Sequence, residues 1–430
     1  MPVNNQPKYA LARWLLVIIV LALAACAPAQ DASCPKLKIG VSVVTEDTSA
    51  KLDQDQGYQA ALNEINLQGV GGCKLELTNP AEPKSTVGDV PRDVRGFADA
   101  GVVAILSAPS NDAAKRAAKM AGYFSIPVII SADTGDDIGV ASEPQWFFRI
   151  NPSQADYSLA AVKWIQSVKN TPGTSVAIWF EHSEYGESAA VSAADTVMKS
   201  SLALGIYQRY SPFLADFKEY TDQLLAVKPN VVWIISSQPS QARKILLSIR
   251  SLSNPSAGAT AYSPALMVGM GVGFTGRDFL YNPEGDPVLT PETLGIPIPW
   301  ATDLSWKGSP QCELVSPPVS PLNLNTPLSV RNVQSYLSLK LVAGALERLS
   351  KKTDWVMGEV KVSDWKEMVR NPAYLPEFRR ALSQEILATK GCQFGGILWA
   401  VNFSSTGLNQ GFPQMMKMDA GKWVTVAPGN

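Results

Sequence analysis

The sequence predicts an α/β protein with two doubly wound domains, each containing a parallel sheet covered by helices. Three observations lead to this prediction. Short apolar segments alternate with stretches of helical periodicity, most of these segments are apolar almost throughout, and the alternation restarts after Asn151-Pro152. Such strands are typical of parallel sheets buried between helical layers. The 430 residues are enough for two domains with separate cores.

The first unit begins at residue 36. Apolar residues alternate over 37–44, which predicts the first strand. Over 53–67 the apolar positions follow the i, i+3, i+4, i+7 spacing of a packed helix, and Gly69 lies just beyond its end. Further strands are predicted at 74–77, 102–106 and 127–130, and a further helix at 112–121.

The second unit repeats this order. Its predicted strands are 175–180, 206–210, 231–236 and 265–269, and its predicted helices include 187–204 and 241–249. The Pro-rich stretch 283–327 is expected to be irregular. A long helix is predicted at 330–349, and short strands near 397–401, 413–418 and 423–426.

The charge balance argues against nucleic acid as a partner. Lys and Arg number 37, Asp and Glu number 38, and the net charge is −1. Phosphate binding needs a clustered positive surface instead. Because His182 is the single histidine, a histidine-based metal cluster is excluded. We expect neither a metal nor a cofactor.

Residues 1–25 have the pattern of an export signal. Lys8 and Arg13 precede an apolar run that is too short for an ordinary membrane-spanning helix. The run ends at Leu23-Ala24-Ala25-Cys26, which resembles the lipobox of bacterial lipoproteins. We therefore expect cleavage before Cys26 and a lipid on its thiol. An ordinary signal peptide and an uncleaved membrane anchor are the alternatives.

The remaining cysteines are even in number, as expected for a chain in an oxidising compartment. Cys34, Cys73, Cys312 and Cys392 allow three pairings. We favour Cys34–Cys73, because each precedes a predicted strand and these strands should be neighbours. The pair Cys312–Cys392 then follows by elimination.

Six segments carry a resemblance to a known family. They are Ile39-Gly40-Val41, residues 57–66, residues 105–110, residues 126–134, Phe147-Phe148-Arg149 and Glu184-Tyr185-Gly186. In order and spacing they resemble the type I periplasmic binding proteins. Within these, they are most similar to the branched-chain amino-acid-binding (Leu/Ile/Val-binding) group in its lipoprotein form.

The resemblance implies an architecture. The domains would be joined by a three-strand hinge, so each would be discontinuous. The first would hold residues 36–150 and 300–388, and the second residues 151–299 and 389–430. The ligand would lie in the cleft between them, outside the carboxyl ends of the parallel strands.

The resemblance also implies a function without covalent chemistry. The protein would be a monomer in the cell envelope, lipid-anchored on the extracytoplasmic side of the membrane. It would capture a small polar ligand, an amino acid or a related amide or carboxylate, for the membrane permease of an ATP-binding cassette importer. A receptor subunit of a membrane signalling system is the alternative. A secreted hydrolase is a third, although the G-x-S-x-G nucleophile elbow is missing.

Two turns of the first domain are candidate ligand sites. Ser107, Ser110 and Asn111 precede the helix at 112–121, whose free amides favour a carboxylate. The same residues would cap that helix without any ligand.

The second turn contains Ser131, Ala132, Asp133 and Thr134. The resemblance implies that Thr134 and a nearby backbone carbonyl hold an amino acid. Asp133 would either meet an ammonium group or act as a cap.

The second domain would contribute Tyr185 and Gln238. Tyr185 would cover the ligand, unless it only packs, and Gln238 follows the strand at 231–236. Relatives that bind amino acids usually have an acid after the last strand, but residues 268–272 contain none. Residues 271–276 spell GxGxxG, yet three prolines interrupt the helix and strand that a dinucleotide fold requires afterwards. A flexible cleft wall is the preferred interpretation.

Overall fold

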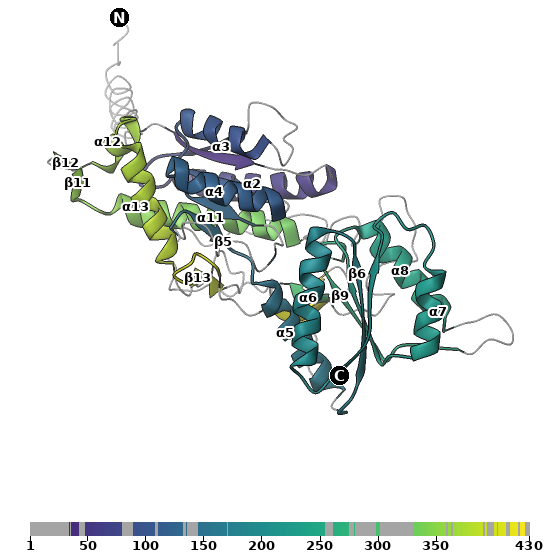
Figure 1. Ribbon diagram of the computed structural model, residues 1–430. Coiled ribbons are helices and arrows are strands. Elements are labelled where there is room, and N and C mark those ends of the chain that lie inside the picture. The colour runs from purple at the N-terminus through teal and green to yellow at the C-terminus, as the bar shows by residue number, and fades with distance from the viewer. Residues whose placement is uncertain are drawn as a thin grey trace, which may run out of the picture.

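The computed structural model has two lobes, each built around a parallel sheet (Figure 1). The structure describes residues 34, 36–42, 48–79, 89–107, 111–131, 135, 145–169, 171–253, 261–274, 279, 298–301, 330–357, 360–362, 364–389, 392–393, 400–401, 403–409, 413–419 and 422–425. The predicted fold class, two doubly wound parallel sheets, is confirmed.

The first sheet has the order β2-β1-β3-β4-β5, and all its neighbouring strands are parallel. Its strands are β1 (Leu37–Ser42), β2 (Leu75–Thr78), β3 (Ala104–Ser107), β4 (Val128–Ile130) and β5 (Phe147–Arg149). Its helices are α2 (Thr48–Gln68), α3 (Val90–Asp99), α4 (Asn111–Phe124), α11 (Val330–Ser350), α12 (Trp365–Arg370) and α13 (Leu375–Leu387). In β3, Ala104 and Leu106 pack in one core with α2 and α11, whereas Ile105 packs in the other with α3 and α4. The sheet is therefore buried on both faces.

Helices α2 and α11 lie together although they are far apart in sequence. The amide of Asn332 donates to the carbonyl oxygen of Asp53 at 2.6 Å. Gly57 allows this approach, because a Cβ atom there would lie 2.2 Å from the carbonyl oxygen of Asn332. A residue larger than glycine at this position would push the two helices apart.

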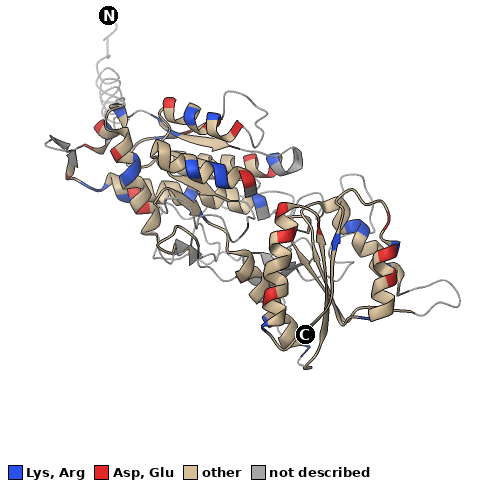
Figure 2. Ribbon diagram, viewed as in Figure 1, with Lys and Arg blue, Asp and Glu red and all other residues tan. Residues whose placement is uncertain are grey.

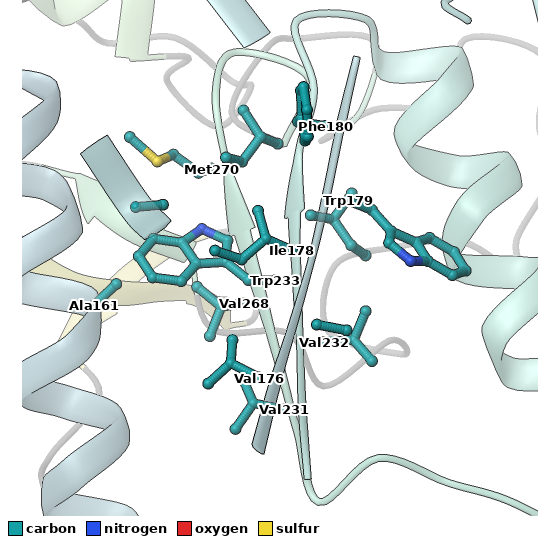
Figure 3. Close-up of a cluster of buried hydrophobic side chains, with 14 of the residues drawn as sticks. Ala161, Val176, Ile178, Trp179, Phe180, Val231, Val232, Trp233, Val268 and Met270 are labelled. Atoms are coloured by element: carbon teal, nitrogen blue, oxygen red, sulfur yellow. The ribbon is translucent and has the colours of Figure 1, made fainter. Parts of the chain in front are cut away.

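The second sheet has the order β7-β6-β8-β9 and is also parallel. Its strands are β6 (Ser175–Glu181), β7 (Ala203–Tyr210), β8 (Val231–Ile235) and β9 (Leu266–Met270), and its helices are α5 (Gln154–Val168), α6 (Glu184–Met198), α7 (Lys218–Val227) and α8 (Pro239–Ser251). Figure 3 shows Trp179 and Trp233 on opposite faces of this sheet. The Trp179 ring meets Tyr220 of α7 edge-on, with centroids 5.6 Å apart. Alternating side chains thus fill both faces.

The C-terminal part of the chain contributes to both cores. The remaining strands are β10 (Ile298–Ala301), β11 (Trp355–Met357), β12 (Val360–Val362), β13 (Cys392–Gln393), β14 (Ala400–Val401), β15 (Gln414–Asp419) and β16 (Lys422–Thr425). Strands β10, β15 and β16 form an antiparallel sheet. Val401 and Phe403 lie in the core of the first lobe, and Met415 lies in the core of the second.

Two predicted elements differ from the structure. The helix predicted at 187–204 ends at Met198, because Ala203 already pairs with Ser175 in the sheet. The stretch 283–327, expected to be irregular, contains β10. Local sequence does not reveal this strand, because its partner β15 lies far along the chain.

The predicted disulfide Cys34–Cys73 is confirmed, with Cα atoms 5.5 Å apart. Its cause is the pairing of β1 with β2, in which Leu37 stands opposite Leu75. Cys312 lies outside the described residues, and of Cys392 only the backbone is described. The predicted signal at 1–25 and Cys26 also lie outside them. Within the described part, no helix has the length and hydropathy of a membrane span.

Candidate functional site

The first cluster of candidate residues lies at the carboxyl edge of the first sheet. Ser107 ends β3, and Ser131 follows β4. The backbone N–H of Ser131 donates to the carbonyl oxygen of Ser107 at 3.0 Å. The structure therefore brings these two turns together, as the parallel order of their strands requires. Both serine side chains are buried.

The Ser131 hydroxyl lies beside Tyr58 of α2, which is itself close to Ser335 of α11. Burial raises the pKa of Tyr58 to about 12, and these two hydroxyl groups limit the rise. The phenol therefore stays neutral near pH 7. Ser131 thus joins the carboxyl edge of the sheet to the packing of α2 against α11.

Four of the candidate residues have no described structure. Ser110, Ala132, Asp133 and Thr134 lie outside the described residues. Asn111 begins α4, but only its backbone is described. Their roles stay predictions.

The second cluster lies at the carboxyl edge of the second sheet. Tyr185 is in the first turn of α6, and Gln238 is the residue before α8. Gly271 has a φ of +102°, and a Cβ atom there would lie 2.3 Å from the Ser236 carbonyl oxygen and 2.9 Å from the Tyr185 hydroxyl oxygen. Gly273 is also close, since its Cβ atom would lie 3.1 Å from the Gln238 nitrogen. Tyr185, Gln238 and the glycine turn are therefore adjacent.

The predicted cleft wall is thus closely packed at Gly271 and Gly273. The N–H of Gly273 donates to the carbonyl oxygen of Ser236 at 3.0 Å. These glycines are explained by close contact between the β8 and β9 turns, which needs no nucleotide.

Glu181 is a residue of this edge that the sequence analysis missed. It ends β6, its side chain is 0% exposed, and its carboxylate accepts two hydrogen bonds. Ser183 Oγ donates to Oε1 at 2.7 Å, and the Ser237 N–H donates to Oε2 at 2.7 Å. Burial, followed by the Glu181 charge, raises the pKa of Tyr210. In the sequence, the feature that could have identified Glu181 is its position as an acidic residue at the end of a largely apolar strand.

His182 lies at the surface and does not activate a nearby serine. Its Nδ1 atom is 2.8 Å from Glu187 Oε1, and Arg209 Nη1 donates to the same oxygen at 3.2 Å. These hydrogen bonds, that of His182 first, lower the pKa of Glu187. The neighbouring hydroxyl of Ser183 donates to Glu181 instead. This geometry does not support the hydrolase interpretation.

An ion pair joins the two lobes that hold these clusters. Lys115 Nζ of α4 lies 2.8 Å from Glu184 Oε1 at the start of α6. Figure 2 shows basic positions along α4 and acidic positions at the start of α6. The pair therefore connects the lobes beside Tyr185.

Residues 36–245 match the sequence profile of the family described as periplasmic binding protein. A search of curated proteins finds no significant match.

The whole fold is similar to many solved structures. One is the substrate-binding protein LivJ of a branched-chain amino acid transporter from Streptococcus pneumoniae, in complex with isoleucine (16% identity, TM-score 0.64, 90% of this chain and 98% of that chain). Another is an extracellular ligand-binding receptor from Rhodopseudomonas palustris (14% identity, TM-score 0.65, 91% of this chain and 100% of that chain). A third is a fatty acid ABC transporter substrate-binding protein from Thermomonospora curvata (16% identity, TM-score 0.62, 91% of this chain and 92% of that chain). At these identities the likeness concerns the fold.

Proposed function

Because residues 36–245 belong to the periplasmic binding protein family and the chain has its type I fold, we propose that this protein binds a small polar solute between its lobes. The observation that supports the proposal is that the carboxyl edges of both sheets lie near a contact between the lobes. The carboxyl ends of both parallel sheets bear polar turns, and Lys115 joins Glu184 across the lobes beside them. Ligands of open α/β sheets bind at such carboxyl edges. The protein would then deliver its solute to the permease of an ATP-binding cassette importer.

The ligand is proposed to be an amino acid or a related amide or carboxylate. In support, structural neighbours include proteins in complex with isoleucine and with leucine. The fatty acid transporter protein has the same fold, so the fold alone leaves the ligand class open. The proposed contacts are Ser107, Ser110, Asn111, Ser131, Ala132, Asp133, Thr134, Tyr185 and Gln238.

The domain boundaries are also part of the proposal. We assign residues 36–150 and 300–388 to the first domain, and residues 151–299 to the second. Val401 and Phe403 pack in the first core, whereas Met415 packs in the second. This packing favours a later position for the last passage of the chain from the first domain to the second, between residues 409 and 413 rather than after residue 388.

We further propose that Cys26 carries a lipid and holds the monomeric protein on the extracytoplasmic side of the membrane. The support is the lipobox-like Leu23-Ala24-Ala25-Cys26. Cys26→Ser should release the protein from membranes into the soluble fraction. A wild-type protein that is already soluble and carries no acyl mass would disprove the anchor.

A thermal-shift screen tests the solute-binding function. It covers the amino acids, their amides and small carboxylates, with a fatty acid as the competing class. A ligand at about 100 times its Kd stabilises the folded state by about 2.7 kcal/mol. We expect a clear rise in Tm with one polar class. A rise with the fatty acid alone would reject the proposed ligand class.

A further inference from the structure

The Glu181 carboxylate joins two turns that are separate in sequence. One oxygen accepts from the side chain of Ser183, which lies just before α6. The other accepts from the backbone of Ser237, which lies between β8 and α8. Both contacts are 2.7 Å long, and the side chain is 0% exposed.

Each of these turns holds a candidate ligand residue. Ser183 Oγ also accepts from the Gly186 N–H at 3.0 Å, which closes the turn around Tyr185. A Cβ atom at Gly186 would lie 2.2 Å from the Glu181 carbonyl oxygen, so this turn is packed directly on the end of β6. Ser237 immediately precedes Gln238. A shift of the carboxylate would therefore move both Tyr185 and Gln238.

We infer that Glu181 is a positioning residue that fixes Tyr185 and Gln238 relative to each other for ligand binding. This inference rests on the proposed solute-binding function. A buried carboxylate is stable only when its oxygens are hydrogen-bonded. Among the described residues no Lys or Arg forms an ion pair with Glu181, and the two turns supply its hydrogen bonds. The carboxylate and the two turns therefore stabilise one another.

The reach of the side chain, rather than its charge, is the property that matters in this arrangement. In Glu181→Gln the amide oxygen can accept from the Ser237 N–H while the amide nitrogen donates to Ser183 Oγ. Glu181→Asp keeps the charge but is one methylene shorter, so it cannot reach both turns. If Glu181 instead acted through its charge on a cationic ligand, the aspartate would be the better replacement.

The experiment measures binding and local structure for the wild type, Glu181→Gln, Glu181→Asp and Glu181→Ala. The probes are L-leucine, L-leucinamide and 4-methylpentanoate, which share one side chain and differ in their charged groups. We expect the glutamine variant to bind the tightest probe within about threefold of the wild type, and the aspartate variant to lose about tenfold, as expected for one lost hydrogen bond. Glu187→Gln is the control, because its carboxylate lies on α6, the helix that carries Tyr185, but pairs with His182 and Arg209 instead of joining the two turns.

Amide hydrogen exchange of the ligand-free protein provides a readout that needs no ligand. The Ser237 and Gly186 amides should exchange faster in the aspartate variant than in the wild type, and at near-wild-type rates in the glutamine variant. Ser183→Ala, which removes one contact and keeps the carboxylate, should accelerate only Gly186. If aspartate binds like the wild type, or glutamine is the weaker variant, the inference is wrong. If no probe binds the wild type, the solute-binding proposal fails for these ligands, and the exchange rates still decide whether Glu181 holds the turns.

Discussion

The two parallel sheets share the order of their first four strands, and only the first sheet has a fifth, but the two lobes are built from different chain paths. The second sheet and its four helices come from one continuous stretch, residues 154–270. The first sheet needs α11 as a cover, and α11 begins about 180 residues after β5. A buried ion pair and a disulfide join distant segments of the first lobe, whereas in the second lobe the Glu181 carboxylate joins two turns at the carboxyl edge of the sheet. We therefore expect the first lobe, which is assembled from distant segments, to depend more on a few specific contacts than the second lobe does.

The largest expected effect is the loss of the buried pair between α2 and α11. Lys340 Nζ lies 2.6 Å from Glu64 Oε1, with side chains 5% and 8% exposed, and the Tyr336 hydroxyl also donates to Glu64. Lys340→Ala leaves a buried carboxylate without its cation, which typically destabilises by about 3–5 kcal/mol. Urea unfolding should show this loss.

The matched control is Lys199→Ala in the second lobe. Lys199 Nζ lies 2.7 Å from Asp195 Oδ2, but the two side chains are 73% and 52% exposed. Exposed pairs contribute about 1 kcal/mol or less. Equal effects of the two variants would contradict the expectation that the buried pair stabilises the protein more than the exposed pair does.

Removal of the disulfide is the second test. Cys34→Ser with Cys73→Ser opens a link between residues 39 positions apart, and such links typically contribute about 2–4 kcal/mol. Calorimetry should show a lower transition temperature for the first lobe and an unchanged one for the second. An equal decrease in the transition temperature of both lobes would contradict this expectation and would show that they unfold as one unit.

The third test concerns two acids, Glu181 and Asp133. The second lobe buries its acid at Glu181, so Asp133 is the proposed partner for a ligand ammonium. Loss of a charge-assisted hydrogen bond costs about 1.5–3 kcal/mol, or about 10- to 150-fold in affinity. Asp133→Asn should therefore weaken L-leucinamide strongly and 4-methylpentanoate little in calorimetric titrations. Tight leucine binding that survives this substitution would overturn the assignment.

The smallest expected effect is at the contact between the lobes. The Lys115–Glu184 pair is 2.8 Å long, with side chains 40% and 41% exposed, and such pairs contribute about 0.2–1 kcal/mol. Lys115→Glu should weaken ligand affinity by up to about fivefold at low salt. Combining it with Glu184→Lys should restore affinity. No rescue would mean that the pair does not stabilise the ligand-bound arrangement.

The sequence was sufficient for the elements that depend on local pattern. Alternating or continuous apolar runs located β1, β3, β6 and β8, and neighbouring strands identified the Cys34–Cys73 bond. Strand β10 was missed because its partner, β15, is remote in sequence. Glu181 was missed because its role depends on Ser237, which is 56 positions away. Periodicity reports which face of an element is buried, but not which distant turn a buried polar group contacts.

The crystal structure of a ligand complex tests the central claim most directly. We expect one solute molecule between the lobes, in contact with the Ser107 and Ser131 turns on one side and with Tyr185 and Gln238 on the other. A solute that contacts only one lobe, or that binds away from the carboxyl edges of both sheets, would contradict the claim.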